Sequence, residues 1–323
     1  MKHRRLVACC VFLLCLGGVQ YGHSREGMEN GHVRSVSALW TMGLEQKKGT
    51  YYAGLRRSAY GLVSKNQHDK WWAEQAREFA GVISDVQAVE PVIIQIISVY
   101  LNNGTTRFGF ERPARYRGSK HNMTFRPGPI DHERALTTYD RRGVKAIVQI
   151  ESGNADVLSC LNIAHLQFGH HPCIIGYGID AEWYFTRESK DNTGLPLRDE
   201  EVKRWVQKIL SFDPRYTLFL KHWKPDHMPP TYRHPNLWFL SDSQDFPSLE
   251  KLLDDLRSWD DAHKDHVVGY QYGYEADRRW WMQMRHPPAD ISRAILRDIP
   301  NTRFLFWVDS TADKVAFGSE EKS

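Results

Sequence analysis

The sequence predicts a single α/β domain of the (β/α)₈ TIM-type barrel class. Apolar runs typical of strands alternate with amphipathic helical patterns, and there are eight strand candidates in all. Several of the runs are apolar on both faces, as expected for strands that helices cover. About 300 residues are enough for one such barrel. The main alternative arrangement of the same elements is an open doubly wound sheet.

Residues 1–24 are predicted to be a signal peptide. Lys2, Arg4 and Arg5 precede an apolar run that ends near Val19, too short to cross a membrane. Cleavage near Ser24 would release a secreted or periplasmic protein, with the catalytic barrel expected over 30–318. Removing the three leader residues from 43 basic residues leaves 40 against 39 acidic ones. We therefore expect no nucleic-acid partner and no later membrane span, and we expect a monomer.

The strand and helix candidates follow one another along the whole chain. The strand candidates are 37–44, 91–100, 145–153, 173–184, 216–223, 237–244, 267–274 and 303–310. The helix candidates are 71–89, 156–168, 202–210, 249–259 and 289–299. The Pro-rich stretch 224–236 is too short for a helix, so one barrel connection is predicted to be a loop. The Arg- and Gly-rich segment 101–129 is predicted to run over the strand ends.

Two carboxylates close the most informative strand candidate, 173–184. Asp180 and Glu182 are two residues apart and therefore share a face in an extended strand. Because burying an ionised carboxylate without partners is very costly, a pair at the end of an apolar run requires a reason. The C-terminal ends of barrel strands are where such folds hold their active sites. We therefore predict catalytic roles for this pair.

Polar or aromatic side chains end most of the other strand candidates as well. One such residue is usually only a solvated edge, but several at the same end of a closed barrel would converge on one pocket. Amides and acids bond sugar hydroxyls, and aromatic faces hold sugar rings, so we predict a carbohydrate substrate. The predicted substrate-binding residues are Gln149, Glu151, Lys221, His222, Asp242, Gln244, Gln271, Tyr274, Glu275, Trp307 and Asp309.

The run GYGIDAEW at Gly176–Trp183 resembles the fourth-strand motif D-G-x-D-x-D-x-E of family 18 glycoside hydrolases, the chitinase-like barrels. The resemblance implies that Glu182 protonates the glycosidic oxygen. It also implies that Asp180 orients a substrate N-acetyl group whose carbonyl oxygen attacks the anomeric carbon. A positioning tyrosine, Tyr272 or Tyr274, and a floor for the sugar, Trp307, are implied as well. The chain departs from the motif at Gly178, where the family has an aspartate.

The departure at Gly178 leaves other functions open. A retaining glycosidase would need a protein carboxylate as nucleophile, for which Glu275, Asp242, Asp309 and Glu151 are the candidates. A carbohydrate-binding protein without catalysis would need none of them, and a structural cell-wall protein would use the barrel only as a spacer. None of these functions requires a cofactor.

Weaker motifs complete the sequence. Cys160 and Cys173 remain after the leader and could form one disulfide or stay as two buried thiols. His170 and His171 are of metal-binding type, but they lie in a predicted turn at the opposite end of the barrel, and we predict no metal ligand. Asn103 and Asn122 begin N-glycosylation sequons, which matter only in a eukaryotic secretory pathway.

Overall fold

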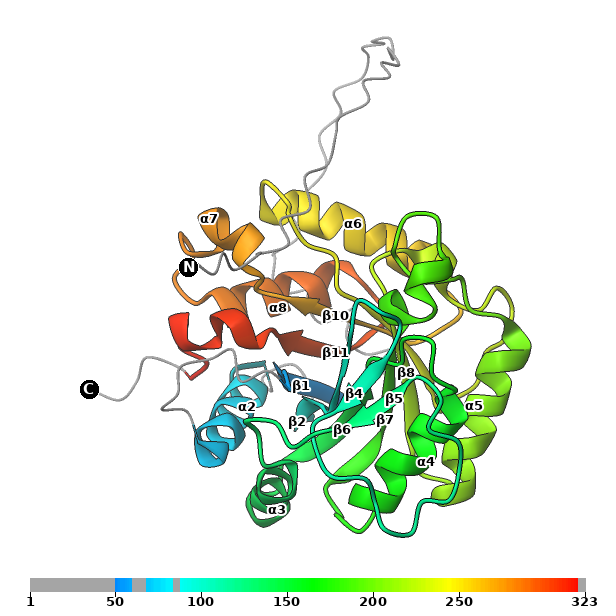
Figure 1. Cartoon of the computed structure of the whole chain (residues 1–323). Coiled ribbons are helices and arrows are strands. Elements are labelled where there is room, and N and C mark those ends of the chain that lie inside the picture. The colour runs from blue at the N-terminus through cyan, green and yellow to red at the C-terminus, as the bar shows by residue number, and fades with distance from the viewer. Residues whose placement is uncertain (1–49, 60–67, 84–87, 319–323) are drawn as a thin grey trace, which may run out of the picture. The chain divides into compact units, whose positions relative to one another are not determined.

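Eight parallel strands close into a barrel in the computed structural model, which describes residues 50–59, 68–83 and 88–318. Around the ring the order is β1, β11, β10, β9, β8, β7, β6 and β2 (Figure 1). The strands are β1 (Tyr51–Arg57), β2 (Val89–Ile96), β6 (Lys145–Ile150), β7 (Ile174–Asp180), β8 (Thr217–Lys221), β9 (Leu237–Ser241), β10 (Val268–Tyr272) and β11 (Thr302–Trp307). The predicted (β/α)₈ class is confirmed, and the open sheet is wrong.

The first strand of the ring is not the one that the sequence predicted. Strand β1 pairs with β2 on one side and with β11 on the other, which closes the barrel. The strand candidate 37–44 and the predicted signal peptide 1–24 lie outside the described residues. The other seven strand candidates each overlap one of the remaining barrel strands.

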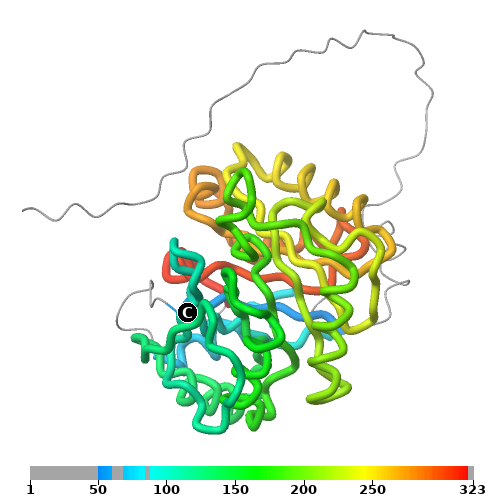
Figure 2. Tube along the Cα trace, turned by 45° about the vertical axis from the view of Figure 1, so that its right-hand side comes forward, coloured from blue at the N-terminus to red at the C-terminus, as the bar shows by residue number. Residues whose placement is uncertain are grey.

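Helices cover the outer face of the ring (Figures 1 and 2). They are α2 (Asp69–Ile83), α3 (His132–Arg142), α4 (Val157–Phe168), α5 (Asp199–Phe212), α6 (Leu249–Ala262), α7 (Arg278–Trp281) and α8 (Pro287–Asp298). Helix α3 was not predicted. The Asp131 side chain caps its first turn by accepting from the Arg134 backbone N–H, and Gly143 ends it with a left-handed φ of 64°.

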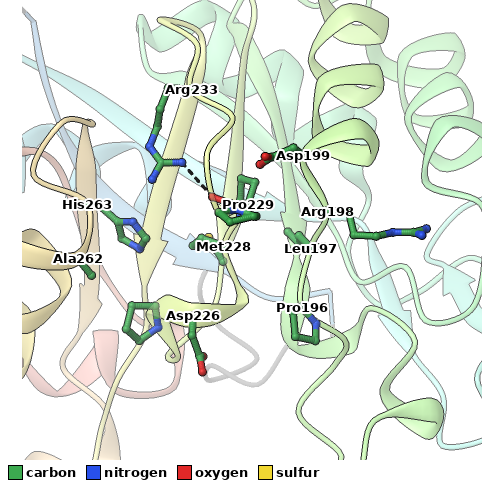
Figure 3. A pocket seen from close by; sticks show the side chains of 12 residues that line it. Pro196, Leu197, Arg198, Asp199, Asp226, Met228, Pro229, Arg233, Ala262 and His263 are labelled. Atoms are coloured by element: carbon green, nitrogen blue, oxygen red, sulfur yellow. Dashed lines mark hydrogen bonds between the residues drawn. The ribbon is translucent and has the colours of Figure 1, made fainter.

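The connection between β8 and β9 has no full helix, as predicted. It has only one short 3₁₀ turn, Pro225–His227, within a Pro-rich segment. A cavity of about 670 Å³ lies beside this segment. Figure 3 shows Leu197, which precedes α5, facing the cavity from one side and His263, which follows α6, from the other. The segment therefore lies where a helix would otherwise pack between α5 and α6.

The excursion after β2 forms a small sheet of its own. Its strands are β3 (Ser98–Tyr100), β4 (Thr106–Phe108) and β5 (Met123–Phe125), with β4 in the middle. The sheet is fixed to the end of β6, because a Glu151 carboxylate oxygen accepts a hydrogen bond from the Tyr100 backbone N–H at 2.7 Å. The segment therefore lies at the C-terminal ends of β2 and β6, as predicted.

The barrel interior changes from apolar to polar along the strands. At one level the Trp238 ring lies 5.3 Å from the Tyr52 ring centroid and 4.7 Å from that of Phe304. Near the C-terminal strand ends the inward positions carry charged and amide side chains. We call this end the mouth.

Candidate active site

A Lys221-centred cluster occupies the mouth between β7, β8 and β9. The Lys221 ammonium lies 2.9 Å from Asp180 Oδ2, contacts Asp242 Oδ2 and lies 3.9 Å from Glu182 Oε1. The Gln149 amide donates a hydrogen bond to Asp180 Oδ2 at 3.1 Å. These five side chains come from four neighbouring strands or the residues just after them. We refer to them as the lysine cluster.

Glu182 reaches the cluster by a route that strand alternation does not describe. Strand β7 ends at Asp180, and Glu182 lies in a one-turn 3₁₀ helix, Ala181–Trp183. The side chain of Glu182 is 21% exposed, whereas that of Asp180 is 3% exposed. Asp180 therefore belongs to the buried wall of the mouth, and Glu182 is the carboxyl group that a ligand can reach.

The pKa values of the three carboxyl groups in the cluster shift in different directions. Burial, followed by the negative charge of Asp242, raises the pKa of Glu182 well above its usual value. Burial also raises the pKa of Asp180, to about 6. Burial alone would raise the pKa of Asp242 too, but Lys221 and a hydrogen bond from Glu182 lower it. These opposite shifts favour the protonated form of Glu182 and the ionised form of Asp242.

The neighbouring carboxyl groups favour the charged form of Lys221. Burial favours its neutral form, but the nearby carboxyl groups of Asp180, Asp242 and Glu182 outweigh burial and raise its pKa. A charged lysine is a poor nucleophile, so the geometry favours an electrostatic role.

A second ion pair closes the other side of the mouth. Arg56 Nη2 lies 2.7 Å from Asp309 Oδ1, and the Ser58 backbone N–H donates to Asp309 Oδ2 at 3.0 Å. Burial opposes ionisation of Asp309, but Arg56 lowers its pKa below the usual value. Asp309 thus has protein partners for both oxygens. Arg56 was missed because β1 was not predicted; the alternation of YYAGLRR would have placed it inside the barrel.

Several polar atoms of the mouth have no hydrogen-bond partner among the described residues. They are Gln149 Oε1, Asp180 Oδ1, Asp242 Oδ1 and Gln271 Nε2. Buried polar atoms are normally paired, so these acceptors and this donor are suited to a polar ligand.

Tyr272 and Trp307 do not lie at the mouth, which corrects two predictions. The Tyr272 hydroxyl is 2.6 Å from Ser292 Oγ on α8, and its ring packs at 5.7 Å against that of Trp307. The Trp307 indole N–H donates to Thr311 Oγ1. Gln271 faces inward, and successive residues of a strand face opposite ways, so Tyr272 faces the outer layer. Trp307 is its partner on β11 and faces the same way. Tyr274 is at the mouth instead, where its hydroxyl donates to the Gln271 side-chain oxygen Oε1 at 3.3 Å.

Glu275 and Gln244 are also outside the mouth. Glu275 is exposed and lies between Arg278, at 3.0 Å, and Lys314, at 2.6 Å. Gln244 is exposed on the loop after β9. A carboxylate with two surface partners is not positioned as a nucleophile for the mouth, so that candidacy of Glu275 is wrong.

Glu151 and His222 support loops around the mouth. Glu151 holds the small sheet through Tyr100, as described above. His222 Nε2 lies 2.6 Å from the Thr193 carbonyl oxygen, and burial lowers the His222 pKa to about 4. Both side chains therefore position backbone, and neither is aimed at a ligand.

Gly178 has a packing role that explains its departure from the family 18 motif. A Cβ atom at this position would lie 2.1 Å from the ring of Phe219, which points inward from β8. An aspartate would therefore collide with an aromatic ring, so the chain has no room for the aspartate that the family 18 motif has at this position.

The two cysteines are separate thiols. Cys160 on α4 and Cys173 before β7 are both buried and free, so the disulfide that the sequence left possible is absent. The Cys173 thiol donates to the Leu136 carbonyl at 3.6 Å, and burial raises its pKa. The alternative of two buried thiols is confirmed.

Comparison with known proteins gives no family. No protein-family model and no curated protein matches the sequence. Among the described residues, no helix is both long and apolar enough to cross a membrane.

Solved structures that align with the chain include three glycoside hydrolases. An FMN-binding β-glucuronidase from Facaelibacterium prausnitzii L2-6 aligns over 82% of this chain and 38% of its own, at 13% identity and TM-score 0.45. A β-D-glucuronidase of Dictyoglomus thermophilum aligns over 80% of this chain and 43% of its own, at 12% identity and TM-score 0.43. An endocellulase from Pyrococcus horikoshii aligns over 80% of this chain and 83% of its own, at 12% identity and TM-score 0.43. The chain spans about two fifths of the glucuronidases. At TM-scores below 0.5, these alignments identify neither a relative nor an activity.

Proposed function

We propose that this protein is a glycoside hydrolase in which Glu182 is the general acid. Glycoside cleavage needs a carboxylic acid that stays protonated at working pH and can reach the leaving oxygen. One observation carries the proposal: burial and Asp242 raise the pKa of Glu182, while 21% of its side chain stays exposed. Asp180, with its higher burial and tighter partners, is less suited to that role.

The nucleophile is proposed to come from the substrate. Two catalytic carboxyl groups stand about 5–5.5 Å apart in retaining enzymes and about 6.5–9.5 Å apart in inverting ones. Asp242 shares a hydrogen bond with Glu182, which is closer than either arrangement. Asp309 and Glu151 are bound by protein partners, and Glu275 faces solvent. These placements favour an N-acetyl group whose carbonyl oxygen attacks the anomeric carbon.

The mouth supplies the groups for such a reaction. Asp180 Oδ1 has no protein partner and can accept the acetamide N–H, which directs the carbonyl oxygen toward the anomeric carbon. As that oxygen bonds to the carbon, the glycosidic bond breaks and Glu182 gives its proton to the leaving oxygen. Glu182 then removes a proton from the water that opens the cyclic intermediate. Lys221 keeps Asp180 and Asp242 in place.

The experiment measures hydrolysis of chromogenic N-acetylglucosaminides, with the matching glucosides and glucuronides as comparison substrates. Glu182→Gln should lower kcat by roughly 10²–10⁴-fold, which is the usual contribution of a general acid, and should leave folding intact. Glu188→Gln is the matched control, because Glu188 lies in the next turn and its side chain pairs with Asn154. Equal activity of the Glu182→Gln and unmodified proteins would refute the assignment. A preference for glucosides would reject only the N-acetyl requirement.

A second candidate function is carbohydrate binding without turnover. The observation that favours it is Lys221, whose ammonium is in contact with Asp180 and Asp242 and so neutralises acids that catalysis would use. In that case chitooligosaccharides should bind with measurable heat while their reducing ends stay constant in number. Any release of new reducing ends that Glu182→Gln removes would exclude it.

A further inference from the structure

We propose that Glu133, His170 and His171 form a binding site for a divalent metal ion, and zinc is the ion that suits them best. Glu133 lies in the first turn of α3, and the histidines lie in the turn between α4 and β7. The site is on the outer wall of the barrel, among elements separate from the lysine cluster. The sequence predicted no metal here, because it did not predict α3 and so gave the histidines no partner.

The three ligand atoms converge at distances that one ion can bridge. Glu133 Oε2 lies 2.9 Å from His171 Nε2 and 3.4 Å from His170 Nε2, and all three atoms are within 4.8 Å of one another. Zinc bonds of about 2.0–2.2 Å at tetrahedral angles place ligand atoms about 3.3 Å apart. Small side-chain movements would therefore bring all three atoms onto one ion, with water as the fourth ligand.

Neighbouring groups orient two of the three ligands. His171 Nδ1 lies 2.6 Å from Asp140 Oδ2, and Asp140 Oδ1 accepts from the Cys173 backbone N–H at 2.8 Å. A carboxylate on one ring nitrogen, which leaves the other for a metal, is the usual support of a histidine ligand. Glu133 Oε1 accepts from the Gln167 amide at 2.8 Å, which leaves Oε2 toward the histidines.

The ligand types and the access select the ion. Two imidazoles and one carboxylate suit zinc and similar transition metals better than magnesium or calcium, which prefer oxygen ligands. The His170 side chain is 63% exposed, so an ion can enter from solvent, whereas His171 is buried. A bound ion would join α3 to the turn that leads into β7. We therefore assign the site a stabilising role.

The test uses the full chain, freed of metal with a chelator. After one equivalent of zinc and dialysis, elemental analysis should give about one zinc per chain, and zinc should raise Tm. Cobalt(II) at the same site should give the visible absorption of a tetrahedral ion. Glu133→Gln and His170→Ala, both at partly exposed side chains, should each bind at least about 10-fold more weakly. His121→Ala is the matched control at an exposed histidine and should bind like the unmodified chain.

Two outcomes would overturn the proposal. One is a zinc content near zero in the unmodified chain. The other is full binding by both Glu133→Gln and His170→Ala, as would occur if the thiols of Cys9, Cys10 and Cys15 held the ion. In either case the cluster would be an ion pair between His171 and its two carboxylates.

Discussion

Two ion-paired groups face each other across the mouth, and they differ in their charge balance. Arg56 has one acidic partner, Asp309, and that carboxylate has the lower pKa expected of a simple pair. Lys221 faces three carboxyl groups, so one positive charge cannot stabilise all of them as anions. Burial and the charge of Asp242 raise the pKa of Glu182, which favours its protonated form.

A buried ion pair by itself therefore does not indicate a catalytic site. Burial alone would raise the pKa of Asp309 and of Glu182 alike. What separates them is the strongest neighbouring charge, which is the cation Arg56 for Asp309 and the anion Asp242 for Glu182. A balanced pair holds the wall of the mouth together, whereas an excess of acids produces a group that can donate a proton.

The largest expected effect comes from removing the lysine charge. Lys221→Met leaves Asp180 and Asp242 buried without their cation, and breaking a buried pair in this way costs about 3–5 kcal/mol. Denaturant unfolding at neutral pH measures the loss. Lys224→Met is the matched control on the loop after β8, where the ion pair with Asp191 is partly exposed and the loss should be much smaller. Equal losses in the two variants would mean that the cluster is not a buried charge network.

A pH series should separate the two groups by the sign of the effect. The folded pKa of Asp180 is raised, so its contribution to stability is complete below about pH 4 and is lost as pH rises through about 6. The difference in unfolding free energy between the unmodified protein and Asp180→Asn should therefore fall over that range, by about 3 kcal/mol for two pKa units.

Asp309→Asn should behave in the opposite way. Its folded pKa is lowered, so its contribution is present above the unfolded pKa and is lost as pH falls through the folded value. The unfolding free energy of the unmodified protein should therefore rise relative to that of Asp309→Asn as pH rises. Curves of the same sign for both variants would remove the distinction between the two groups.

The smallest effect distinguishes two tyrosines on opposite sides of the wall. Tyr272→Phe removes a buried hydrogen bond to Ser292 and should cost about 1 kcal/mol of stability without changing kcat. Tyr274→Phe should instead lower kcat/KM about 5-fold, because its hydroxyl lies at the mouth beside Gln271. Thermal unfolding and initial rates of both variants check this, and a loss of rate confined to Tyr272→Phe would reverse the assignment.

Alternation in the sequence predicted the barrel and most members of the lysine cluster. The strand ends of β7, β8 and β9 carry Asp180, Lys221 and Asp242 at inward positions, as the period of two requires. The same period could not say which face of β10 and β11 points inward. Both faces of a barrel strand are buried, one by the interior and one by helices, so Tyr272 and Trp307 looked as suitable as Gln271.

Other features were missed because their signals are local or weak. Helix α3 buries little beyond Ala135, Leu136 and Tyr139, so its apolar stripe is faint. Glu275 follows β10 by only a few residues, but the 3₁₀ turn that begins there directs it to the surface. The cluster's proton distribution depends on contacts between residues as far apart as Glu182 and Asp242, which no single run of sequence contains.

The contact between Arg56 and Asp309 joins the first and last strands of the barrel across 253 positions of the chain. During synthesis Glu182 emerges well before Asp309, so for that interval it belongs to an incomplete ring open to water. An acid that solvent surrounds ionises near its ordinary pKa. The barrel is closed only when β11 pairs with β1, so a chain truncated before β11 would carry every residue of the lysine cluster without the closed ring around it.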